Sequence, residues 1–272
     1  MLNAIFGTGS KQATPLDMAE AAIEKKDYPA LAQAAKDIAI LVPENRYLVE
    51  PLLIVADRLA ENKAFVPQAI DAAKVAAGNS PSGSDLERQA VRTWVKHVDA
   101  LPDAAQRINA AKGAAGYAPS GSDLERQAVS TILKHVDALP DAAQRIDAAK
   151  VAARYSPSGS DFARQVVSTW VKHVDALPDA AQRINAAQMA ANYAPSGSDL
   201  AEQAVSTWVK HVDALPDAAQ RIDAAQVAYD YAPSGSDLAR QAKMKLDEEK
   251  TASPTIPTEI AAKSFANKFK PS

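Results

Sequence analysis

The chain has 272 residues, of which 47% are hydrophobic but only 6% aromatic, and it contains no cysteine. The lack of cysteine excludes disulfides, zinc ribbons and thiol catalysis, and a net charge of −3 gives no general attraction to a polyanion such as nucleic acid. A core must be built mainly from Ala, Val, Leu and Ile, whose small side chains let helices pack closely.

One pentapeptide, Pro-Ser-Gly-Ser-Asp, recurs with a fixed period of 38 residues, beginning at Pro81, Pro119, Pro157, Pro195 and Pro233. A fixed period between 20 and 50 residues is typical of stacked repeat arrays. Each interval contains two amphipathic segments, which we name helix A and helix B. The sequence therefore predicts an all-α fold, a right-handed α-solenoid of about six helix-turn-helix repeats of 38 residues plus a C-terminal capping helix.

The 38-residue register also extends backwards from the near-identical repeats. Ala34-Ala35-Lys36 aligns with Ala72-Ala73-Lys74, so two diverged repeats come first, as the exposed end of an array requires. We expect a flexible N-terminus at 1–14, a repeat domain at 15–250 and a flexible tail at 251–272 that could instead dock through a short amphipathic piece. The predicted units are about 5–42, 43–80, 81–118, 119–156, 157–194 and 195–232, with the cap at 233–250.

The unit 81–118 shows how each repeat is punctuated. Pro81-Ser82-Gly83 predicts a turn, and Ser84 with Glu87 predicts a capping box at the start of helix A. Pro102 and Asp103 are predicted in the first turn of helix B. The apolar stripe of helix A carries Leu, Val and Trp, whereas that of helix B is mostly Ala.

The four histidines occupy one register, within Lys-His-Val-Asp, at His97, His135, His173 and His211. A metal site would need a second ligand four residues later, where the sequence has Leu, and Asp99 points away from His97. We interpret them as histidines at the core boundary, with a pH-sensing role as the alternative. Trp94, Trp170 and Trp208 share a register with Ile132, which favours a core role over a stacking platform for a ligand.

The near-copies differ at helix B positions spaced i, i+3, i+4 and i+7, and these positions form one exposed ridge per repeat. We call this set the helix B ridge and predict that it binds a partner, with neutral drift as the alternative. Its residues are Asn109, Lys112, Gly116, Asp147, Lys150, Val151, Arg154, Asn185, Gln188, Met189, Asn192, Asp223, Gln226 and Asp230. Position 113 varies with them, and helix A varies at Arg92, which is Ser130, Ser168 and Ser206 elsewhere.

No catalytic residues, metal ligands or cofactors are predicted. The serines are turn and cap residues, and Pro-Ser-Gly-Ser lacks the lysine and the strand of a phosphate-binding loop. The charges of the individual repeats also argue against nucleic-acid binding. The unit 81–118 carries five cations and four anions but the unit 195–232 carries two cations and six anions, so the array runs from slightly basic to acidic.

The helix pair, its period and the run Leu-Pro-Asp-Ala-Ala-Gln-Arg-Ile from Leu101 resemble the HEAT-like and tetratricopeptide-like class of α-solenoids. The resemblance covers about residues 15–247 and implies macromolecular binding, although the tetratricopeptide Trp/Leu-Gly/Tyr pattern is absent. We expect a non-enzymatic scaffold, a monomer that binds a protein or peptide on the helix B ridge. A secreted bacterial effector, a HEAT-like enzyme acting on a macromolecule and a self-assembling filament are the alternatives.

The sequence also bears on where the protein is located in or outside the cell. No run of about 18 apolar residues exists that could span a bilayer, and the first residues lack the basic and long apolar segments of an export signal. We therefore expect a cytoplasmic protein, with secretion by a system that needs no signal peptide as the alternative.

Overall fold

The computed structural model describes residues 13–156, 160–195 and 197–252. Over these ranges the chain forms thirteen α-helices and no strand, which confirms the all-α repeat fold. Contacts divide the chain into two compact units, Met1–Thr131 and Ile132–Ser272, and the division falls within one helix, α7. Most of the predicted flexible N-terminus and most of the predicted flexible tail lie outside the described residues.

The first unit contains the two diverged repeats and the first of the near-identical ones. Its helices, with short 3₁₀ turns labelled η, are α1 Pro15–Lys25, α2 Tyr28–Leu41, η1 Arg46–Leu48, α3 Val49–Leu59, η2 Lys63–Phe65, α4 Val66–Asn79, α5 Asp85–His97, η3 Val98–Ala100, α6 Ala104–Tyr117 and the first part of α7 Asp123–His135.

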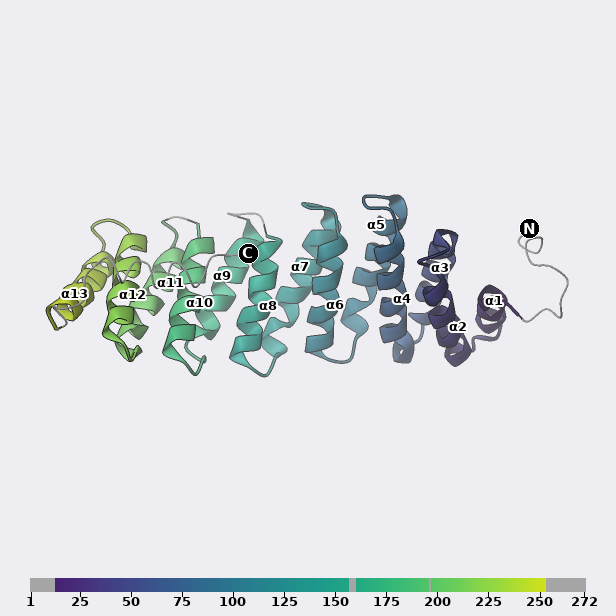
Figure 1. Ribbon diagram of the computed structural model, residues 1–272, viewed down its shortest axis with the longest axis horizontal. Coiled ribbons are helices and arrows are strands. Elements are labelled where there is room, and N and C mark those ends of the chain that lie inside the picture. The colour runs from purple at the N-terminus through teal and green to yellow at the C-terminus, as the bar shows by residue number, and fades with distance from the viewer. Residues whose placement is uncertain (1–12, 157–159, 196, 253–272) are drawn as a thin grey trace. The chain divides into compact units, whose positions relative to one another are not determined.

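The second unit continues with η4 Val136–Ala138, α8 Ala142–Arg154, α9 Asp161–Val174, α10 Ala180–Tyr193, α11 Asp199–His211, η5 Val212–Ala214, α12 Ala218–Tyr231 and α13 Asp237–Ala252. Helices α5, α7, α9 and α11 are therefore helix A of their repeats, and α6, α8, α10 and α12 are helix B. In Figure 1, α8, α10 and α12 lie side by side in one layer of this unit, with α9 and α11 behind them. The capping helix, predicted to end near Lys250, ends at Ala252.

The turns between repeats require glycine, because Gly83, Gly121, Gly197 and Gly235 have φ between 72° and 78°. Helix A then begins on a serine whose hydroxyl accepts a backbone N–H, as Ser84 does from Glu87 at 3.2 Å. The carboxylate of Glu87 accepts from the backbone N–H of Gly83 at 2.5 Å. The capping box is therefore present in function, but its return bond goes one residue upstream of the expected cap.

Helix B begins two residues later than predicted. Asp103 is its N-cap, accepting from the backbone N–H of Gln106 at 2.8 Å, and the helix starts at Ala104. Pro102 therefore lies before the cap and not in the first turn. Arg107 fixes this corner from inside the helix by donating from Nε to the carbonyl of Leu101 at 2.7 Å.

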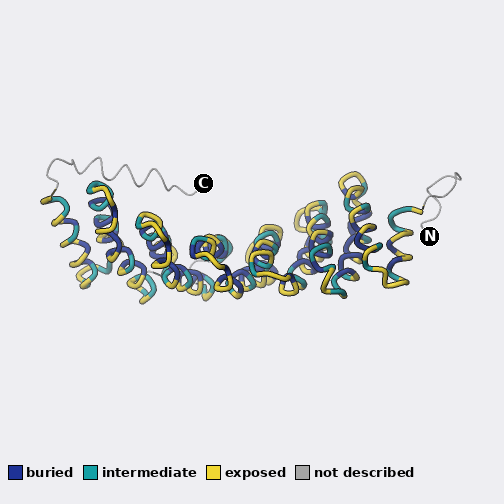
Figure 2. The backbone as a smooth tube through the Cα atoms, turned by 90° about the horizontal axis from the view of Figure 1, so that it is seen from below, coloured by how far each residue is buried: buried dark blue, intermediate teal, exposed yellow. Residues whose placement is uncertain are grey.

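Consecutive helices pack along each other across the repeat boundary, α4 with α5 in the first unit and α8 with α9, α10 with α11 and α12 with α13 in the second. Trp170 marks one such contact, because its buried Nε1 donates to the carbonyl of Ile146 in α8 at 3.1 Å. Figure 2 shows buried residues where helices face their neighbours and exposed residues at loops and outer faces. Trp94, Trp170 and Trp208 are at most 2% exposed, which confirms their core role.

No described helix is both long enough and apolar enough to cross a membrane.

Candidate functional site

The helix B ridge lies on α6, α8, α10 and α12, and most of its side chains reach solvent. Exposed positions are Asn109, Gly116, Asp147, Lys150, Arg154, Asn192 and Asp230. Intermediate positions are Lys112, Val151, Asn185, Gln188, Met189 and Gln226. Within the second unit, these positions lie on three helices that share one layer (Figure 1).

Asp223 departs from the predicted exposed ridge, because it is only 5% exposed. Its Oδ2 atom is buried and has no hydrogen-bond partner. This burial raises the pKa of Asp223 from 3.8 to about 6, because removing the carboxylate from water disfavours its charged form. The equivalent residues Asn109 and Asp147 remain exposed, so burial of a carboxylate destabilises the fold at Asp223 and not at these counterparts.

Asp223→Asn is expected to stabilise the protein above pH 6 by on the order of 1–3 kcal/mol. A carboxyl whose folded pKa is raised destabilises the fold while it is ionised, so the gain is complete above pH 6 and disappears as the pH falls toward the ordinary value of 3.8. Urea unfolding between pH 4 and 8 measures the gain. Asp147→Asn, at the exposed equivalent position, should change little at any pH, and an equal response of the two variants would contradict a burial effect.

Asn192 of the ridge also contributes to packing between repeats. The hydroxyl of Tyr231 donates to Asn192 on the preceding helix B, and Tyr117 approaches Gly78 in the same way, since a Cβ built there would lie 3.3 Å from the tyrosine oxygen. Position 113 is a packing position as well. A Cβ on Gly113 would lie 2.5 Å from the Trp94 ring, so a side chain there would require the ring to move.

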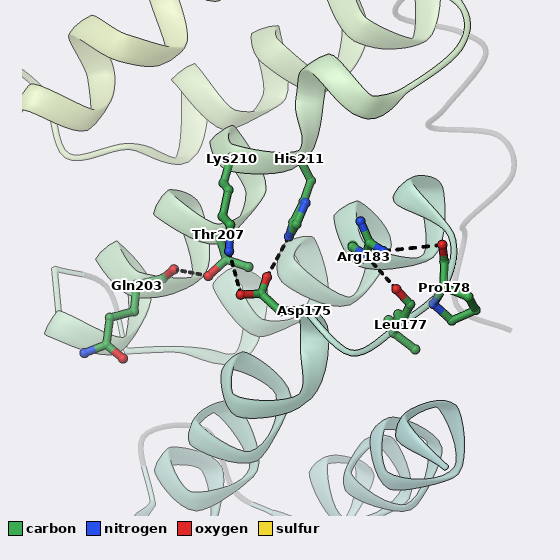
Figure 3. A network of polar contacts seen from close by, with 8 residues as sticks. All are labelled: Asp175, Leu177, Pro178, Arg183, Gln203, Thr207, Lys210 and His211. Atoms are coloured by element: carbon green, nitrogen blue, oxygen red, sulfur yellow. Dashed lines mark hydrogen bonds and ion pairs between the residues drawn. The ribbon is translucent and has the colours of Figure 1, made fainter.

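The Lys-His-Val-Asp motif joins one repeat to the next, a role that sequence reasoning missed. The carboxylate of Asp175 accepts a hydrogen bond from Lys210 Nζ at 2.6 Å and another from His211 Nε2 at 2.7 Å (Figure 3). One repeat earlier, Asp137 accepts from Lys172 at 2.5 Å and from His173 at 2.7 Å. We call this three-residue contact the anchor.

The anchor combines a buried and a solvated partner. His173 and His211 are 6% and 7% exposed, whereas the aspartate side chains are 57% and 55% exposed. Because a carboxylate only accepts, each imidazole donates its Nε2–H. The bonds from Lys and His lower the pKa of Asp137 and of Asp175 below the ordinary value of 3.8. The histidines therefore lie at the core boundary as predicted, with a specific partner in the preceding repeat.

At the C-terminal end, α13 replaces the anchor with other residues. Lys245 binds Asp213, and Glu249 accepts from Arg221 Nε at 2.7 Å in a partly buried pair. Glu249 raises the pKa of Arg221 further, and a second nitrogen of this arginine still donates to the carbonyl of Leu215 at 2.8 Å. The predicted polar cap is thus joined to the last repeat by two ion pairs.

In the first unit, the joint between α3 and α5 has a loose contact in place of an anchor. Lys96 Nζ and His97 Nε2 lie 3.9 and 3.6 Å from Asp57 Oδ1. Asp57 lies within α3, one helical turn before the register of Asp137 and Asp175, and Glu61 occupies the anchor register but pairs with Arg58. Burial, followed by the charge of Lys96, lowers the pKa of His97.

Among the described side chains, no group of three His, Asp or Glu residues is close enough to hold a metal ion.

Comparisons with known proteins place the chain in no family. No protein-family model matches it, and no curated protein does. Among solved structures, one from the computational design of self-assembling cyclic protein homooligomers is similar at 14% identity and a TM-score of 0.15, covering 94% of this chain and 95% of that chain. A de novo designed 16-helix transmembrane nanopore is similar at 18% identity and a TM-score of 0.13, covering 92% and 67%. The chain is a repeated helical array, and the comparisons assign it no activity.

Proposed function

We propose that the protein is a non-enzymatic scaffold that binds an extended segment of a partner protein along the helix B ridge. The observation that carries this proposal is the change in ridge chemistry over three adjacent helices of the second unit. On α8 the exposed ridge residues are the cations Lys150 and Arg154 and the anion Asp147, whereas on α12 the exposed ridge charge is the anion Asp230. Between them, α10 presents the half-exposed apolar side chain of Met189.

This arrangement fits a partner segment that is acidic at one end and basic at the other. An acidic end would lie over α8, an apolar residue would contact Met189, and a basic end would lie over α12. Helices of such arrays are about 8–10 Å apart, so a segment crossing three of them spans about six extended residues. Opposite charges at the two ends would set the direction of binding and suppress wrong partners.

The resemblance to HEAT-like solenoids supports the same class of function by analogy, because such arrays present extended surfaces to macromolecules. The ridge also offers no convergent set of acid, base and nucleophile, which a macromolecule-directed enzyme would need.

Charge changes on α8 test the proposal. In the variant Lys150→Gln/Arg154→Asp, each new residue is one that the chain already has at the equivalent positions, at Gln226 and Asp230, so folding should be retained. Quantitative capture of interacting proteins on immobilised wild type and variant should show a partner whose recovery falls at least about tenfold, as expected when charge-assisted contacts are lost. Met189→Glu should weaken the same partner.

The matched control lies on helix A of the same unit. Arg164→Glu copies Glu202 of the next repeat and changes charge by the same sign on α9. Recovery of the partner should be unchanged in this variant. A partner lost equally in the α8 and α9 variants would indicate general charge attraction, and a partner lost only with Arg164→Glu would place binding on helix A.

A further inference from the structure

The loose joint between α3 and α5 opens a pocket of about 430 Å³ in the first unit. Its volume falls within the usual range of small-ligand sites. At the tight joints of the second unit, the lysine of helix A is held by aspartate at 2.5 and 2.6 Å, whereas Lys96 lies 3.9 Å from Asp57. The displaced aspartate therefore leaves Lys96 available on the pocket wall.

Three cations of α5 line this pocket, Arg88, Arg92 and Lys96, spaced i, i+4 and i+8 on one helix face. Arg88 is already engaged, because it pairs with Asp85 and donates to the carbonyl of Gly83 at 2.8 Å. Arg92 makes no hydrogen bond or ion pair to any residue that the structure describes. It is also specific to this repeat, since the chain has Ser130, Ser168 and Ser206 at the equivalent positions.

A neutral donor completes the pocket. In the other repeats the residue equivalent to Thr93 is also threonine. Its hydroxyl donates to the backbone carbonyl four residues earlier, at 2.9 to 3.0 Å in Thr131, Thr169 and Thr207. Thr93, which lines the pocket, does not make that bond within the described chain, so its hydroxyl is available to a ligand. Asp57 also lines the pocket, and because its side chain is 45% exposed, its carboxylate can accept from an N–H or O–H of the same ligand.

We propose that this pocket binds a phosphoryl group. Its three terminal oxygens match the fork of Arg92, the ammonium of Lys96 and the hydroxyl of Thr93, and arginine recognises phosphate through paired hydrogen bonds. The acceptor on Asp57 selects a phosphoryl group that carries a donor beside it, as a phosphorylated serine does through its backbone N–H. The site lies on helix A and is independent of the helix B ridge.

Isothermal titration of the full chain tests the site with three probes. These are inorganic phosphate, a blocked Gly-phosphoserine-Gly peptide and the same peptide with glutamate at the centre. The phosphopeptide should bind saturably at one site, and the glutamate peptide should bind at least about tenfold more weakly, because it has one charge and one oxygen fewer. Phosphate as strong as the phosphopeptide would identify a free phosphate compound as the ligand, whereas weaker phosphate would identify a phosphorylated peptide.

Two variants decide whether the proposed geometry is responsible. Arg92→Ser copies the other repeats and should weaken the phosphopeptide at least about tenfold with unchanged helicity and unfolding midpoint. Ser168→Arg puts the same arginine beside a tight anchor, and no second site should appear. The proposal is overturned by absent saturable binding, by equal affinity for the glutamate peptide, by an unaffected Arg92→Ser or by an equal new site in Ser168→Arg.

Discussion

Replacing Asp175 by alanine is expected to lower the free energy of unfolding by about 2 kcal/mol, because two charge-assisted hydrogen bonds are lost and a buried imidazole is left without a partner. His211 is only 7% exposed, so water cannot fully replace the carboxylate that accepts its Nε2–H. The solvated Lys210 contributes less, as exposed ion pairs do. Urea unfolding followed by far-ultraviolet circular dichroism measures the loss.

The effect of Asp175→Ala should depend on pH in one direction. The pKa of Asp175 is lowered in the folded protein, so its contribution is complete above the ordinary value of 3.8 and disappears as the pH falls through the depressed folded value. The stability difference between wild type and variant should therefore be constant near neutrality and shrink below about pH 4.

Asp57→Ala is the matched control for the anchor. The same substitution removes an aspartate from the loose joint, where the nearest cations lie 3.6 and 3.9 Å away and Oδ1 has no hydrogen-bond partner. Alanine is also the better helix former within α3. This variant should lose less than about 0.5 kcal/mol, and equal losses at Asp57 and Asp175 would show that the anchor contributes no more than an ordinary surface charge.

Gly113→Val is expected to destabilise the protein by about 2 kcal/mol through overpacking. Even the first side-chain carbon would lie 2.5 Å from the ring of Trp94, which is 2% exposed and enclosed by the core. Valine is acceptable at the equivalent Val151, in the repeat that has Ile132 at the tryptophan position. The later repeats combine Trp170 with Met189 and Trp208 with Val227, so the 2.5 Å approach at Gly113 is particular to this repeat.

A double substitution tests this pairing directly. Trp94→Ile alone should destabilise by leaving a cavity, whereas Trp94→Ile/Gly113→Val copies the pair Ile132 and Val151 and should recover much of the loss. We expect a favourable coupling of at least about 1 kcal/mol between the two positions. Strictly additive effects of the two substitutions would mean that the pair does not act as a packing unit.

The sequence predicted the helices well because each is marked twice, by an apolar stripe and by a glycine turn or an aspartate cap that the period repeats. The helix B start was displaced because Pro102 and Asp103 can both begin a helix, and only the Asp103 side-chain bond to Gln106 decides between them. Turns, caps and apolar stripes that recur in register were therefore predictable from the sequence. At this corner the predicted start of helix B was wrong by two residues.

Contacts between repeats were harder to predict. Within one motif the aspartate was expected to point away from its own histidine, yet an aspartate serves the histidine of the following repeat, 36 residues later in the case of Asp175 and His211. The recurring Lys-His-Val-Asp at a fixed period was the available signal, because stacking brings equivalent turns together. The loose contact between α3 and α5 had no such signal in the sequence. Asp57 lies one helical turn before the register of the anchor aspartates, and its approach to helix A depends on how α3 packs against α5.

The ridge was predicted from variation alone, and variation does not distinguish exposure from packing. Position 113 varies although Gly113 packs against the Trp94 ring, and Asp223 is buried although its equivalent Asp147 is exposed. The remaining exposed positions of α8, α10 and α12 are those on which the proposed partner surface depends.

Site-specific photocrosslinking tests that surface most directly. A benzophenone side chain is placed at position 154 on α8 or at position 164 on α9, both exposed in the structure, and each protein is irradiated with the partner recovered by capture. We predict a covalent adduct from position 154 and none from position 164. Adducts from position 164 alone would contradict binding on the helix B ridge.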